Sequence, residues 1–163
     1  MTIEDLLRGE EGAILDEATR AVADLEHYRR DGAQATRGRL ELLHRHLVDA
    51  VLSRDLNVLR AHVTRMAHER FAGGFDVTEV QAAFSALEDA IWSKALSRLP
   101  PDERAWGLSL VGTVLAQGRS TLARTFESLA PRAPEPCVDL APLFLGADAV
   151  RTSRSVEELV FPV

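Results

Sequence analysis

Apolar residues recur at three- and four-residue steps along almost the whole chain, and this spacing is what most constrains the fold. In the segment near 12–30, for example, the repeat is formed by Ile14, Ala18, Val22, Leu25 and Tyr28. Side chains spaced in this way share one face of an α-helix, which can then pack against other helices. No strand pattern or internal repeat stands out. The sequence therefore predicts an all-α fold.

Boundary signals divide this periodic chain into about five main helices. We expect them near 12–30, 36–52, 55–72, 76–98 and 102–129. The clearest start is at Asp76, a good N-cap residue, because Glu79 can bond back to the exposed backbone amide. The clearest end is at Gly73-Gly74, because glycine readily adopts the left-handed backbone that stops a helix.

Three weaker boundary signals complete this division. Thr2 and Asp5 form a capping-box pair in front of a short leading helix at 3–7. Asp31-Gly32 is expected to end the 12–30 helix, and Pro101 suits the first turn of the last helix.

The composition changes at Pro131, where the main helical domain is expected to end. Residues 131–136 contain three prolines and read as an extended linker. Beyond them, 137–163 mixes apolar clusters with polar residues. We expect a domain over 1–130 and a less regular tail over 131–163 that packs on this domain or on a partner subunit.

The composition fits one globular protein in a reducing compartment. The 163 residues are 46% hydrophobic and 27% charged, which permits a substantial core. The single cysteine, Cys137, excludes an intramolecular disulfide. No apolar run approaches the roughly 20 residues of a transmembrane helix, and the N-terminus does not read as a signal peptide. We therefore expect a cytoplasmic protein that does not enter membranes.

The net charge of −6 disfavours nucleic-acid binding, because phosphate backbones are repelled by an acidic protein. A local basic patch occurs at Arg29, Arg30, Arg37 and Arg39. Acidic neighbours dilute it, and aromatic residues for base stacking are missing.

No catalytic or metal-binding pattern is complete in the sequence. Glu41 and His44 have the Glu-x-x-His spacing of di-iron bundles, but the required second pair does not occur. The five histidines form no ligand pair at helical spacing, although haem needs only one and stays open; they are His27, His44, His46, His62 and His68. Cys137 lies beside prolines, away from any histidine in the sequence. We expect no catalytic residue, no metal site and no cofactor.

The middle of the chain carries a family resemblance. It rests on Arg70-Phe71-Ala72-Gly73-Gly74-Phe75-Asp76-Val77, followed by Glu79-Val80, Phe84, Leu87 and Ala90-Ile91-Trp92. Over about residues 12–130 the chain resembles the N-terminal sensor domains of the stressosome co-antagonists (RsbR/RsbRD type). The resemblance implies a globin-like helical fold without haem, a homodimer, and a sensory or regulatory role. Family members continue into a phosphorylatable STAS domain or another output module, for which the residues up to Val163 leave no room.

The leading hypothesis is a non-enzymatic bacterial signalling sensor or protein-interaction domain that acts as a homodimer, with another signalling protein as a further partner. Glycines in the last helix permit a close approach within or between subunits. The candidate interface residues there are Trp106, Gly107, Gly112 and Val114. The alternatives are a globin-like protein that binds haem or a small ligand, and a metal-dependent helical-bundle enzyme.

Overall fold

The computed structural model describes residues 1–131, which form seven α-helices and no strand. In chain order the helices are α1 (Ile3–Gly9), α2 (Glu11–Val22), α3 (Glu26–Asp31), α4 (Ala33–Ser53), α5 (Asn57–Ala72), α6 (Val77–Arg98) and α7 (Pro101–Leu129). The predicted all-α helical bundle is therefore confirmed. The expectations for the tail fall almost wholly on residues 132–163, which lie outside the described part.

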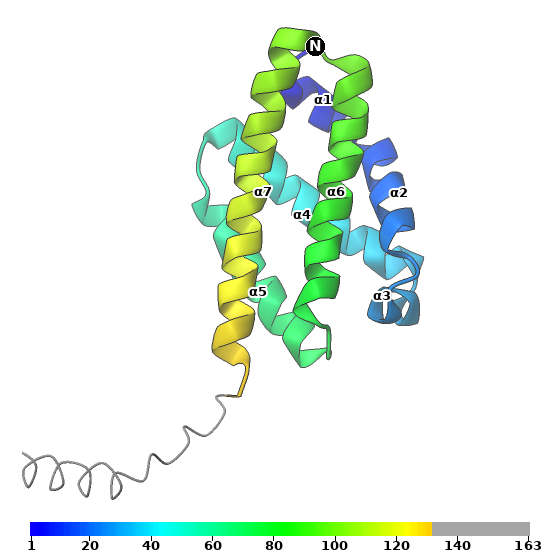
Figure 1. The fold of residues 1–163 in the computed structure, drawn as a ribbon, viewed down its shortest axis with the longest axis vertical. Helices are drawn as coiled ribbons and strands as arrows, with labels where there is room; N and C mark the ends of the chain where they lie inside the picture. The colour runs from blue at the N-terminus through cyan, green and yellow to red at the C-terminus, as the bar shows by residue number, and fades with distance from the viewer. Residues whose placement is uncertain (132–163) are drawn as a thin grey trace, which may run out of the picture. The chain divides into compact units, whose positions relative to one another are not determined.

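The two longest helices, α6 and α7, run side by side, and α4 crosses behind them (Figure 1). α2 packs along α6, while α5 packs along α7. The core between these helices is apolar, and its largest fully buried side chains include Phe84, Ile91 and Leu115. α6 and α7 therefore form a pair whose inner side packs against the other helices.

The prediction of one continuous helix near 12–30 is wrong, because the chain breaks between Val22 and Glu26. Leu25 has an extended backbone, with φ −68° and ψ 139°, and α3 starts directly after it. The break redirects the chain so that Tyr28 is buried with its ring edge-on to Phe75, at 5.3 Å between centroids. Tertiary packing here overrides the local helical pattern.

The glycine signals act as predicted at the end of α5. Gly74 has a φ of +80°, which an L side chain rarely adopts. The Phe75 amide donates to the Arg70 carbonyl at 3.0 Å, and the Gly74 amide donates to the Phe71 carbonyl at 3.1 Å. This pair of bonds is a Schellman motif, which satisfies carbonyls left free by the helix end.

Two glycines of α7 allow close helix packing inside the chain. A Cβ added at Gly107 would lie 2.8 Å from Ile3 Cβ, and one added at Gly118 would lie 2.8 Å from Phe84 Cε1. Atoms of a packed core do not approach this closely without displacement. The close approach expected from the sequence is therefore intramolecular at both positions.

We predict that Gly118→Ala destabilises the fold although alanine favours helices. The new methyl group must displace the buried Phe84 ring, and overpacking of this kind costs about 1–3 kcal/mol. Gly38→Ala on α4 is the matched control, because nothing lies within 4 Å of its added Cβ; it should stabilise by about 0.5–1 kcal/mol. Urea denaturation measures both, and an equal gain in stability for the two variants would contradict the packing argument.

Candidate functional site

The outer face of the α6–α7 pair carries mostly neutral exposed side chains. Its exposed stripes are Ser85, Asp89, Trp92 and Leu96 on α6, and Ala105, Ser109, Thr113, Ala116 and Ser120 on α7. Asp89 is the one charged residue in these two stripes, but Arg104 lines the groove between the helices, and the ion pair of Glu88 with Arg119 joins the two helices beside it. These charges cancel in pairs, and an exposed aromatic residue among mostly neutral side chains is typical of the centre of a protein interface.

A groove of about 710 Å³ runs along this face between the two helices. Trp92 and Leu96 line it from α6, and both remain substantially exposed. The α7 wall contains small residues such as Ala105 and Gly112, together with the larger side chains of Arg104 and Leu108. We call this face, with its groove, the α6–α7 face.

The four interface residues predicted from the sequence do not lie together. Gly112 lines the groove. Trp106 is exposed but lies outside the groove, with its ring 4.8 Å from the Arg54 guanidinium carbon. Gly107 and Val114 are buried in the chain's own core, so their assignment to a face between subunits is corrected. Leu96 lines the groove, although the sequence analysis did not single it out.

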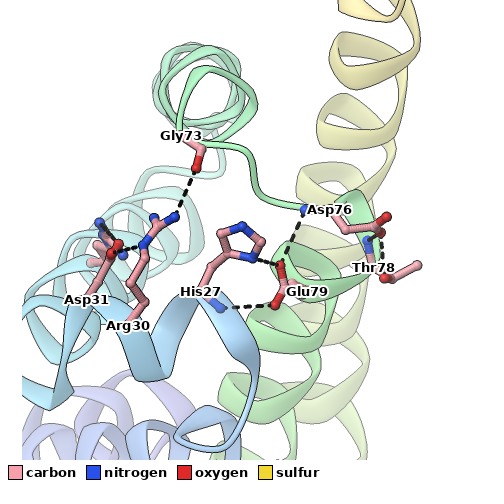
Figure 2. Close-up of polar contacts among 8 residues, drawn as sticks. His27, Arg30, Asp31, Gly73, Asp76, Thr78 and Glu79 are labelled. Atoms are coloured by element: carbon pink, nitrogen blue, oxygen red, sulfur yellow. Dashed lines mark hydrogen bonds and ion pairs between the residues drawn. The ribbon is translucent and has the colours of Figure 1, made fainter.

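The start of α6 is held by one carboxylate that serves two helices (Figure 2). Glu79 accepts a hydrogen bond from the Asp76 amide at 3.3 Å, which completes the predicted capping box. It also accepts from the His27 amide at 3.2 Å and contacts His27 Nδ1 at 2.6 Å. The local cap was predictable, whereas the contact with His27 joins residues 52 positions apart.

Asp31 ties α3 to α4 and indirectly to the end of α5. It accepts from Arg30 Nε at 2.8 Å and from Arg39 Nη2 at 2.7 Å. These two guanidinium contacts lower the pKa of Asp31 to about 2. Arg30 also reaches the Gly73 carbonyl at 3.5 Å (Figure 2).

Phe75 is the apolar centre of this junction. Its buried ring lies 4.9 Å from the His27 ring between centroids, and Tyr28 packs against it edge-on. Burial raises the pKa of the Tyr28 hydroxyl to about 12, so it stays neutral at physiological pH. Three guanidiniums also lie within 6 Å of the Phe75 centroid, those of Arg30, Arg39 and Arg70.

Few of the side chains that the sequence offers as metal or haem ligands lie close together in residues 1–131. Within residues 1–131, no three His, Cys, Asp or Glu side chains are placed to hold a metal ion. His44 is buried on α4 and lies 3.5 Å from Glu11 of α2. The histidine pair that does form is His46 with His62, between α4 and α5, with ring centroids 4.2 Å apart. Spacing within a single helix gave no sign of this pair.

None of the helices in residues 1–131 combines the length and the apolar character that crossing a bilayer requires. Comparisons of the chain with protein-family models, with curated proteins and with solved structures find no match.

We predict that Glu79→Ala destabilises the protein more than Asp5→Ala. Both residues are the N3 carboxylates of a capping box, at α6 and at α1, and loss of the hydrogen bond that each accepts from the N-cap amide costs about 0.5–1.5 kcal/mol. Glu79→Ala also leaves the His27 amide and ring without their acceptor, which adds about 1 kcal/mol or more. Urea denaturation of both variants tests this difference, and equal losses would mean that the contact between α3 and α6 contributes nothing.

Proposed function

We propose that this chain is a non-enzymatic protein-interaction domain of a bacterial signalling system and that it acts as a homodimer through the α6–α7 face. The observation that carries the proposal is the mostly apolar exposed surface around Trp92 and its groove. An acidic chain with a net charge of −6 repels its own copies except where the local charge is balanced. On the α6–α7 face Glu88 is paired with Arg119, and Arg104 offsets Asp89, so this face carries no excess of negative charge.

The shape of this face suits a second copy of the same chain. A two-fold interface brings the same patch of each subunit together, so each patch must supply both a projection and a hollow. Trp92 and Leu96 project from α6, and the small side chains beside Gly112 form the hollow on α7. Trp92 of one copy can thus fill the groove of the other.

The size of the face also agrees with a dimer. α6 has 22 residues, so at about 1.5 Å per residue it is about 33 Å long, and two helices side by side are about 20 Å wide. The face then covers about 660 Å² per copy, or about 1,300 Å² in a dimer, within the roughly 1,200–2,000 Å² of specific interfaces.

The sensory part of the proposal rests on the resemblance to the stressosome sensor domains, which implies a dimer with a regulatory role. A gene for a kinase, phosphatase or STAS protein beside this one would support that assignment. A neighbourhood of unrelated metabolic genes would argue for a different pathway.

The dimer is tested by sedimentation of the full chain and of two tryptophan variants. Trp92→Glu places a charge in the groove and should weaken dimerisation by tenfold or more, since a buried unpaired charge costs about 1.4 kcal/mol or more. Trp106→Glu is the matched control, because Trp106 is equally accessible but lies outside the groove; it should leave the dimer intact.

Two outcomes would contradict this proposal. A full chain that stays monomeric at high concentration would remove the homodimer. A dimer that Trp106→Glu disrupts while Trp92→Glu does not would place the interface elsewhere on the molecule.

A further inference from the structure

A second pocket, of about 350 Å³, lies between α4 and α5, and its polar lining is mostly basic. We call it the basic pocket. Its volume is at the lower end of the about 300–1,000 Å³ typical of small-molecule sites. The charged and titratable residues that line it are Arg39 and His46 from α4, and His62, Arg65, Glu69 and Arg70 from α5.

The crossing of α4 and α5 places like residues opposite each other in this pocket. The rings of His46 and His62 stack at 4.2 Å between centroids. Farther along, the Arg39 and Arg70 guanidiniums both lie over Phe75, at 5.4 Å and 5.5 Å from its centroid. Arg39 is paired with Asp31 at 2.7 Å, whereas the carboxylate nearest to Arg70 among its ion pairs is that of Glu69 at 4.0 Å. The positive charge of Arg70 is therefore only weakly balanced by the protein.

Three of the residues that line the basic pocket each carry a buried nitrogen without a hydrogen-bond partner within residues 1–131. His62 is only 9% exposed, and its Nε2 has no hydrogen-bond partner among the described residues. The same holds for the buried Nδ1 of His46 and Nη1 of Arg39. Buried polar groups are normally satisfied, and an unsatisfied one calls for an explanation such as a missing ligand.

Arg70 adds a buried positive charge to the same place. It is 8% exposed, and its Nη1 lies 4.0 Å from Glu69 Oε2, beyond hydrogen-bond distance. Glu69 itself is mostly exposed, so solvent screens its charge. Burial, followed by the charge of Arg39, lowers the pKa of Arg70.

We propose that the basic pocket binds a small oxyanion, namely phosphate or the phosphate group of a small ester. Guanidinium groups match the geometry of phosphate oxygens and form strong, charge-assisted hydrogen bonds with them. Arg39 and Arg70 would clamp the anion, Arg65 would close it from the exposed side, and His62 would donate from Nε2. A cation is disfavoured there because three guanidiniums line the pocket.

The rest of the lining fits an ester with a small organic part. Leu42 and Met66 contribute apolar surface to the same pocket. The lining of the basic pocket fits a small-ligand-binding role. All of its residues lie on α4 and α5, so ligand binding there does not depend on dimerisation through the α6–α7 face.

Binding of an oxyanion in this pocket should be linked to proton uptake. Burial, followed by the charges of His46, Arg65 and Arg70, lowers the pKa of His62 to about 4, and burial also lowers the pKa of His46. Both rings are therefore neutral in the free protein at pH 7, and an anion beside them stabilises their charged forms. The other charges acting on these rings and guanidiniums come from Asp31, Arg39, Arg45, Asp49 and Glu69.

The first test is calorimetric titration of the full chain with inorganic phosphate and with phenyl phosphate, against a chloride background of equal ionic strength. We expect one site per chain, and binding of phenyl phosphate at least as tight as that of phosphate. Arg65→Gln should weaken the binding about tenfold, because it removes one charge-assisted contact from an exposed position. Arg45→Gln is the control, since Arg45 lies on α4 beside His46 but outside the pocket.

A second measurement follows the His62 ring proton by NMR as a function of pH. With saturating phosphate, the pKa of His62 should rise clearly above its value of about 4 in the free protein. Absence of phosphate binding at millimolar concentration would overturn the proposal. So would equal weakening by Arg45→Gln and Arg65→Gln, or a His62 pKa that phosphate does not change.

Discussion

The Glu79 carboxylate fixes the start of α6 and holds α3 against it, at the junction where the chain turns from α5 into the α6–α7 pair. A capping box alone fixes only where α6 begins. The additional bonds from Glu79 to the His27 amide and ring also fix where α3 lies against that start. Phe75 directly precedes the cap, so the same junction holds its ring against His27 and Tyr28. A short helix of six residues, α3, would have little reason to keep its place without these contacts.

The features that depend on neighbouring residues could be predicted from the sequence. The capping box at Asp76, the left-handed glycine at Gly74 and the proline at the start of α7 each involve residues within one turn of one another. The break between α2 and α3 could not be predicted in this way. Helical periodicity continues through Leu25, and the reason for the break is the packing of Tyr28 on Phe75, far along the chain.

The candidate sites could not be fully predicted from the sequence either, for a different reason. A glycine in a helix indicates that something approaches closely, but not what approaches. Gly107 meets Ile3 of the same chain, whereas Gly112 lines an open groove. In the same way, the spacing of His44 and His46 on one helix excludes a pair, although His46 pairs with His62 across two helices. Positions between helices depend on how the helices cross, which the pattern of a single helix does not contain.

A contribution to the stability of the fold does not explain why the basic pocket holds buried arginine side chains. Replacing a buried charge with an apolar residue of similar size is often neutral or stabilising, so a leucine or methionine in place of Arg70 would relieve its repulsion from Arg39. The contact with Phe75 does not require Arg70 either, because Arg30 and Arg39 already lie over the same ring. The composition offers no explanation, since the chain is acidic as a whole. Arg39 already has Asp31 as an acceptor, but among the described residues its Nη1 and the Nε2 of His62 have no partner, and Arg70 reaches no carboxylate within hydrogen-bond distance. A single oxyanion would supply an acceptor to all three.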